Sequence, residues 1–142
     1  MREIITLTIS ASIDSVWAVL TESAYTKQYM FNCSVESSWI QGSPIVWQGE
    51  FNGFKAYQKG EILSIEPFKS VTYSTFDPNF GLEDIPENYI HVTYQLEYSE
   101  GLTTLTISNE TFDGNSERMA HIIQGWNMVC PGIKSAAESV PA

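Results

Sequence analysis

The chain has 142 residues, 43% of them hydrophobic and only 17% charged, a balance that excludes a disordered chain and is typical of a globular domain. At this length, folding buries roughly 70% of the unfolded chain's surface, so we expect one domain spanning residues 1–142. Seventeen acidic and seven basic side chains give a net charge of -10, which argues against nucleic acid and membrane surfaces as partners.

The first residues and the two cysteines bear on where the protein works. Residues 1–12 alternate in polarity and include Glu3, so they lack the uninterrupted apolar core of a secretory signal. No stretch approaches the ~20 apolar residues of a membrane-spanning helix. Cys33 and Cys130 have no companion ligands at metal spacing, so we interpret them as buried thiols, with a disulfide or a zinc site as less favoured alternatives. We expect a cytoplasmic protein with no metal and no cofactor.

A strand followed by two short helices is predicted at the start of the chain. Polar and apolar side chains alternate over residues 3–9, which indicates a strand with one buried face. Ser12 then stands as a helix N-cap before IDSVWAVLT, whose apolar residues have helical spacing. A weaker helical pattern covers residues 23–29 and ends before the strand-like FNCSVESSW.

Strands joined by short turns are predicted from about residue 31 to residue 111. Gly, Pro and Asn residues punctuate runs such as PIVWQGEF, AYQKGEILSI and SVTYSTF, as in an antiparallel meander. The clearest hairpin is NYIHVTYQLEYSEGLTTLTIS, in which Ile90, Val92, Tyr94 and Leu96 share one buried face, and Leu105 and Ile107 continue that face on the partner strand.

Residues 77–88, DPNFGLEDIPEN, form the longest stretch without periodicity. Two prolines, one glycine and four acidic residues indicate an exposed loop between neighbouring strands. An ordinary connection is the favoured interpretation, and a lid over a cavity mouth is the alternative.

A long amphipathic helix is predicted after Asp113–Gly114, with Asn115 or Ser116 as its N-cap. Over nearly 26 residues one apolar stripe recurs at helical spacing: Met119, Ile122, Trp126, Val129, Ile133, Ala136 and Val140. Pro131 lies inside this helix and should bend it, because proline lacks an N–H and clashes with the preceding turn. A curved sheet wrapped around such a helix can leave a cavity between them, and the 13% aromatic content supports ring-lined walls.

Three segments carry a family resemblance. ISASIDSVWAVLTE, GEILSIEPFKSVTYS and GWNMVCPGIKSAAE together resemble the START-like (SRPBCC) superfamily, and within it the activator of heat-shock protein 90 ATPase homologue-like family. The similarity covers essentially the whole chain. It implies an α+β helix-grip (START/Bet v 1-like) fold, in which a curved antiparallel sheet wraps one long C-terminal helix and two short helices follow the first strand. Pro131 lies deeper in the helix than in this pattern, and the usual GG after the second strand is reduced to Gly42–Ser43.

Catalytic patterns are scarce. His91 and His121 are the only histidines, and His91 has the parity of the polar face of its strand, so we interpret both as solvated structural residues. The sequence has no Gly-rich phosphate loop, nucleophile elbow or HExxH, and we assign no catalytic residue. Glu50 and Glu61 lie on neighbouring predicted strands and could meet in a cavity, although placement on the surface is favoured.

A binding site is better supported, because ligand pockets are mostly apolar concavities. The central turns of the long helix must face the sheet, and the sheet supplies aromatic residues opposite them. We therefore expect the ligand-binding residues to be Trp47, Tyr73, Phe76, Tyr94, Trp126, Val129, Cys130 and Ile133. The alternative for each is a dry core position.

The leading functional hypothesis is binding of a small apolar or amphipathic molecule in the helix–sheet cavity. One alternative is a cyclase- or hydratase-like enzyme that uses the same cavity, with Glu50, Glu61, Tyr73 and Tyr94 as its candidate polar groups. Another, suggested only by the family resemblance, is a chaperone-interacting protein. Exposed Tyr and Phe residues in the strands also leave a homodimer open.

Overall fold

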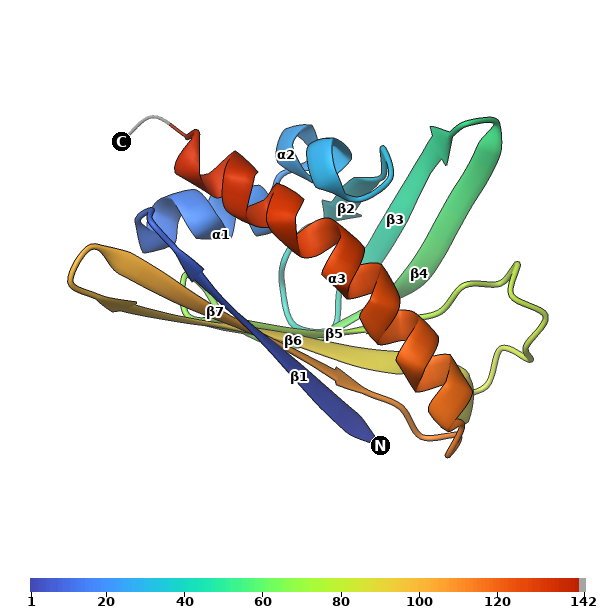
Figure 1. Cartoon of the computed structure of the whole chain (residues 1–142). Helices are drawn as coiled ribbons and strands as arrows, with labels where there is room; N and C mark the ends of the chain where they lie inside the picture. Colours follow the sequence, from blue (N-terminus) through green and yellow to red (C-terminus); the bar gives the residue numbers. More distant parts are fainter. Residues whose placement is uncertain (141–142) are drawn as a thin grey trace.

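A seven-stranded antiparallel sheet curves around the long helix α3 (Ser116–Glu138) in the computed structural model, which describes residues 1–140 (Figure 1). The strand order is β1-β7-β6-β5-β4-β3-β2. The strands are β1 (Arg2–Ile9), β2 (Ser34–Ser37), β3 (Pro44–Phe51), β4 (Phe54–Glu66), β5 (Ser70–Thr75), β6 (Ile90–Ser99) and β7 (Leu102–Glu110). Strands β2 to β7 form a meander, as the turn pattern predicts, and β1 adds to its far edge beside β7.

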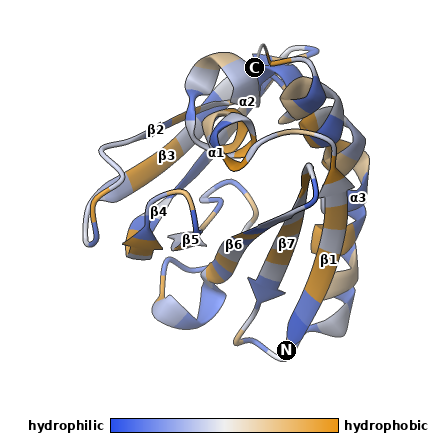
Figure 2. Cartoon of the chain, turned by 90° about the vertical axis from the view of Figure 1, so that its left-hand side faces the viewer, coloured by the Kyte–Doolittle hydropathy of each residue, from blue (hydrophilic) through white to orange (hydrophobic). Residues whose placement is uncertain are grey.

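Two short helices, α1 (Ile13–Thr21) and α2 (Ser23–Tyr29), close one end of the curved sheet (Figure 2). The Ser12 side chain accepts a hydrogen bond from the Ser15 backbone N–H at 3.2 Å, so the predicted N-cap of α1 is confirmed. Tyr29 joins this end to the core, because its buried hydroxyl donates to the Val19 carbonyl at 2.9 Å. The fold is therefore the helix-grip arrangement that the element order and the resemblance imply.

The predicted face of the β6–β7 hairpin is confirmed by the register. Tyr94 lies opposite Ile107 and Leu96 opposite Leu105, and all four side chains are buried. Because side chains alternate across a strand, Asn109 continues the same inner face of β7. It is fully buried and lies opposite Val92.

Helix α3 begins after Asn115, whose side chain accepts from the Arg118 N–H at 3.0 Å, so Asn115 and not Ser116 is the N-cap. The helix has 23 residues and ends at Glu138, slightly earlier than the apolar stripe suggests. The predicted stripe faces the sheet: Met119, Val129, Ile133 and Ala136 are buried, and Ile122, Trp126 and Val140 are half-buried. Pro131 lies inside the helix on its exposed side.

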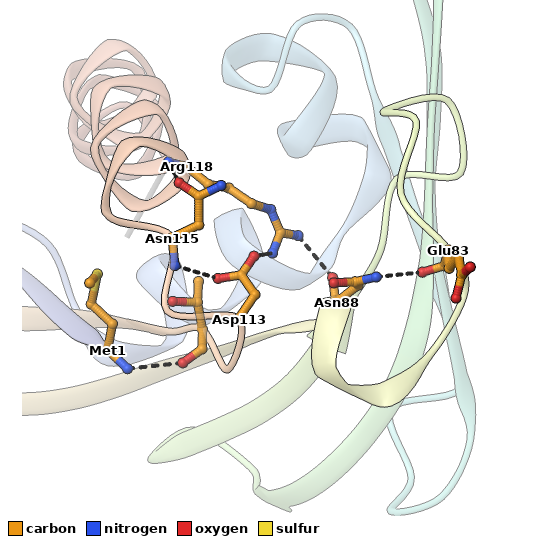
Figure 3. A network of polar contacts seen from close by, with 7 residues as sticks. Met1, Glu83, Asn88, Asp113, Asn115 and Arg118 are labelled. Carbon is orange, nitrogen blue, oxygen red and sulfur yellow. Dashed lines mark hydrogen bonds and ion pairs between the residues drawn. The ribbon is translucent and has the colours of Figure 1, made fainter.

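The predicted loop at residues 77–88 is exposed for most of its length and contains a short 3-10 helix at Pro86–Asn88. Arg118 at the start of α3 ties this loop to the domain, as Figure 3 shows. Its guanidinium donates to the Asn88 carbonyl at 2.8 Å and to the Asp113 carboxylate at 2.7 Å. The loop is thus anchored to the same helix that forms one wall of the interior.

Candidate ligand-binding site

A cavity of about 250 Å³ lies between the inner face of the sheet and α3. Three parts of the fold enclose it: strands β3 to β7, the stretch of α3 from His121 to Val129, and the segment between α2 and β2. Most of its lining is apolar or aromatic. The lining residues are Met30, Phe31, Cys33, Trp47, Ala56, Tyr57, Gln58, Tyr73, Thr75, Ile90, Val92, Asn109, His121, Ile122, Gly125, Trp126 and Val129.

The absence of a side chain at Gly125 explains why the cavity lies beside this part of α3. A Cβ atom built on Gly125 would meet no other atom within 4 Å. About two helical turns further on, a Cβ on Gly132 would lie only 2.7 Å from the Cβ of Tyr29, so there the helix packs tightly against α2. A glycine inside a helix costs about 1 kcal/mol relative to alanine, and at Gly125 no close packing compensates for that cost. The consequence is an open volume beside Trp126.

Trp126 and Asn109 join the two walls of the cavity. The indole Nε1 of Trp126 donates to the Asn109 Oδ1 at 2.9 Å. Asn109 is fully buried on β7, whereas Trp126 is half-buried on α3. The bond therefore fixes the rotation of the tryptophan ring against the sheet. No protein atom in residues 1–140 accepts a hydrogen bond from the Asn109 Nδ2.

A pair of tyrosines lies next to this bond. The hydroxyls of Tyr73 on β5 and Tyr94 on β6 are 2.8 Å apart, and the Tyr94 ring meets the edge of Trp126 at a centroid distance of 6.1 Å. Desolvation by burial is the main cause that raises the pKa of both hydroxyls above the ordinary value for tyrosine. Both phenols are thus neutral at physiological pH, and Tyr73 is one of the residues that line the cavity.

The rim of the cavity carries exposed side chains of Phe31, Gln58 and His121. Phe31 and Asn32 have φ values of +50° and +63°, a left-handed backbone that is rarely adopted by a bulky aromatic residue. Gly49 on β3 permits this path, because a Cβ there would lie 2.2 Å from the Asn32 carbonyl oxygen. Phe80 of the 77–88 loop also lies near this rim, because its ring centroid is 6.4 Å from that of His121.

Four of the eight residues that the sequence assigns to ligand binding lie in the cavity lining: Trp47, Tyr73, Trp126 and Val129. The other four lie outside it. Tyr94 lies behind Tyr73, and Phe76 stacks on Tyr89 at a centroid distance of 5.0 Å. Cys130 and Ile133 belong to the packed core around α3. Apolar periodicity cannot separate a core position from a cavity wall, and the role of all eight in binding stays a prediction.

Sequence reasoning missed Asn109 and Gly125, which define the polar and the open parts of the cavity. Asn109 could have been found, because it continues the parity of Leu105 and Ile107. His121 was interpreted as a solvated residue, and it is exposed but lies at the rim.

The remaining candidate polar groups lie elsewhere. His91 is half-buried and does not line the cavity. Its ring packs edge-on against that of Phe112, with the ring centroids 4.7 Å apart. Glu50 and Glu61 are exposed, and neither lines the cavity. Cys33 and Cys130 are buried free thiols, and burial raises the pKa of both.

Within residues 1–140, no three His, Cys, Asp or Glu side chains come together in a way that could hold a metal ion. In the same described part of the chain, no helix combines the length and the apolar character needed to cross a membrane.

Comparison with known protein families shows to which family this chain belongs. The family model described as activator of Hsp90 ATPase homolog 1-like protein matches residues 10–138. The chain belongs to this family. The resemblance carried by the three sequence segments is thereby confirmed. A search of curated proteins found no match.

Three solved structures illustrate this similarity. The solution structure of ChR145 from Cytophaga hutchinsonii is 32% identical, with a TM-score of 0.78 over 95% of this chain and 92% of that chain. The Aha1 dimer from Colwellia psychrerythraea is 21% identical, with a TM-score of 0.75 over 98% of this chain and 97% of that chain. DynU16, a protein in the dynemicin biosynthetic locus, is 16% identical, with a TM-score of 0.77 over 97% of this chain and 47% of that chain.

Proposed function

We propose that this chain binds a small, neutral and mainly apolar molecule in the cavity between the sheet and α3. The observation that carries the proposal is the volume of about 250 Å³ beside Gly125, enclosed largely by apolar and aromatic side chains. For comparison, an engineered apolar cavity of roughly 150 Å³ is large enough to bind benzene. The cavity therefore has room for a substituted ring.

The charge of the lining supports a neutral ligand. Of the cavity-lining residues that the structure describes, none is Lys, Arg, Asp or Glu. A charged ligand placed among these side chains would lose its hydration with no Lys, Arg, Asp or Glu to pair with, and the one lining histidine, His121, is exposed at the rim. The formal net charge of -10 also repels anions at a distance.

A cavity-filling variant tests the proposal. Gly125→Leu places an isobutyl group in the open volume, and Asn127→Leu places the same group on the exposed side of the same helix. NMR titration with neutral ring compounds such as toluene, acetophenone and cyclohexanone should give saturable shifts around Val92, Ile122 and Val129. We expect these shifts in the wild type and in Asn127→Leu and their loss in Gly125→Leu. Shifts that persist in Gly125→Leu, or are absent from the wild type, would contradict the proposal.

A second candidate is a cyclase- or hydratase-like enzyme that uses the same cavity. The observation in its favour is that Tyr73, one of the cavity-lining residues, carries a neutral phenol whose hydroxyl lies 2.8 Å from that of Tyr94. A neutral phenol can protonate or polarise a substrate oxygen. The exposure of Glu50 and Glu61 removes the two carboxylates that this candidate would have used. If this role exists, Tyr73→Phe should retain ligand binding and lose turnover of any substrate that wild-type protein converts.

We also propose that the chain self-associates through the tip of the β3–β4 hairpin. Phe51 and Phe54 are 49% and 64% exposed there, and Phe31 packs edge-on against Phe51 at 6.0 Å. The similar Aha1 protein from Colwellia psychrerythraea is a dimer. Sedimentation equilibrium of the wild type and of Phe54→Ser tests this association, and a monomeric wild type would contradict it. Interaction with an Hsp90 homologue stays a prediction that a pull-down with purified components can test.

A further inference from the structure

The orientation of the Asn109 amide is determined by its neighbour on α3. A tryptophan indole can only donate a hydrogen bond, so the Asn109 atom 2.9 Å from the Trp126 Nε1 must be the acceptor Oδ1. This assignment leaves the Nδ2 amino group, with its two N–H donors, as the free end of the side chain.

The Asn109 Nδ2 is buried and unsatisfied. Asn109 has 0% exposure, it lines the cavity, and no acceptor in the described chain forms a hydrogen bond with its Nδ2. Buried donors are normally paired, because an unpaired donor loses its hydration without compensation. Among the side chains of residues 1–140, the Thr111 Oγ1 is the other buried polar atom without a partner, but Thr111 does not line the cavity. Asn109 is therefore the polar group whose missing partner a ligand in this cavity can supply.

We infer that the ligand presents an uncharged oxygen acceptor, and that the Asn109 Nδ2 donates to it. The inference rests on the proposed ligand-binding function and deepens it to a class of ligand, a ring compound that carries a ketone or aldehyde oxygen. Trp126 acts as a positioning residue, because its bond to Oδ1 holds the amide with Nδ2 directed away from the indole.

A carbonyl group fits this site better than a hydroxyl or a carboxylate. A carbonyl oxygen only accepts, so it is satisfied by the Asn109 donors alone. A ligand hydroxyl would also bring an O–H donor, while one of the two lone pairs of the Asn109 Oδ1 already accepts from Trp126. A carboxylate would need a cationic partner, and the described cavity lining contains neither Lys nor Arg.

The test compares two probes of the same shape. Acetophenone and α-methylstyrene differ in one group, a C=O in the first and a C=CH2 in the second. In the wild type we expect acetophenone to bind roughly ten-fold more tightly, which is the effect of one net hydrogen bond. Acetophenone should also shift the side-chain NH2 resonances of Asn109, and α-methylstyrene should leave them nearly unchanged.

The matched variant is Asn109→Leu, which keeps the size of the side chain and removes its donors. It should bring the affinity ratio of the two probes close to one, chiefly by weakening acetophenone binding. Should Asn109→Leu fail to fold, Trp126→Phe supplies a second variant, because it releases the Asn109 amide from its fixed orientation and should reduce the preference for acetophenone.

The outcomes separate this inference from the proposed function. Equal binding of both probes to the wild type, with unmoved Asn109 resonances, would overturn the role of Asn109 and leave the ligand-binding function intact. If neither probe binds the wild type, both the inference and the proposed function are overturned. A preference for acetophenone that disappears in the variant supports both.

Discussion

The hydroxyls of Tyr73 and Tyr94 are 2.8 Å apart and buried, and they form a diagonal pair on the neighbouring strands β5 and β6. Tyr73→Phe or Tyr94→Phe leaves the remaining hydroxyl buried without its partner. We expect each single variant to lose about 1–2 kcal/mol of unfolding free energy. The double variant should lose less than the sum, because it removes both polar groups. Urea unfolding of the four proteins measures this coupling.

The control for this cycle is Tyr98→Phe, which removes an equivalent hydroxyl from a side chain that is 54% exposed. Its effect should stay below about 0.5 kcal/mol. If the double variant loses as much unfolding free energy as the two single variants together, the hydrogen bond between the two hydroxyls does not stabilise the fold.

High pH should destabilise the protein through Tyr29, Tyr73 and Tyr94. Burial raises the pKa of all three hydroxyls above the ordinary value of 10.0. The folded state therefore keeps protons that the unfolded chain releases above about pH 10, so the stability present below that pH is lost as the pH rises. We expect the unfolding free energy to fall by up to about 4 kcal/mol per pH unit, at 1.36 kcal/mol for each retained proton.

Urea titrations between roughly pH 9 and pH 11 measure this slope, and tyrosinate absorbance follows ionisation directly. Of the seven tyrosines, the three buried ones should ionise only together with unfolding. Their ionisation in the folded protein, with no loss of stability, would contradict the prediction.

The order and type of the elements could be predicted from the sequence because each has a local cause. The parity of Tyr94 and Leu96 gave the buried face of β6, and Ser12 gave the start of α1. The pairing of β1 with β7 had no local signal, since it joins strands from opposite ends of the chain. It depends on the curvature of the whole sheet and on the contacts that α3 makes with it.

The candidate site was only half predictable for a related reason. Periodicity predicts inward-facing side chains for both Trp126 and Cys130, but only Trp126 lines the cavity, whereas Cys130 lies in the packed core. Whether a buried apolar residue meets a neighbour or empty space depends on what is missing nearby. Here the empty space lies beside Gly125, which has no side chain, and a pattern of hydrophobic residues does not reveal such a position.

Two glycines of α3 should respond in opposite ways to the same substitution. Gly125→Ala adds a methyl group in open space and improves helix propensity, so we expect a gain of about 0.5–1 kcal/mol in unfolding free energy. Gly132→Ala places its Cβ 2.7 Å from the Tyr29 Cβ and forces α2 and α3 apart. We expect it to cost about 1–3 kcal/mol. Thermal and urea unfolding measure both, and equal effects at the two positions would refute the packing difference.

Arg118 should control the exchange protection of the 77–88 loop. Its guanidinium bonds both to the Asn88 carbonyl and to Asp113, whose carboxylate pKa is lowered mainly by the Asn115 backbone N–H and further by Arg118 (Figure 3). Arg118→Ala removes both bonds, so amide hydrogen exchange over residues 83–89 should become roughly ten-fold faster.

The control for the loop prediction is Lys134→Ala, because Lys134 forms an exposed ion pair with Glu138 near the other end of the same helix. This variant should leave loop exchange unchanged, since its bonds to Glu138 and to the Thr8 carbonyl are remote in the chain from residues 77–88. Unchanged protection in Arg118→Ala would mean that other contacts hold the loop, in particular the bonds from Lys59 and Tyr89 to Asp84. Because Phe80 of this loop lies against His121 at the cavity rim, faster exchange there would also make the loop a candidate lid.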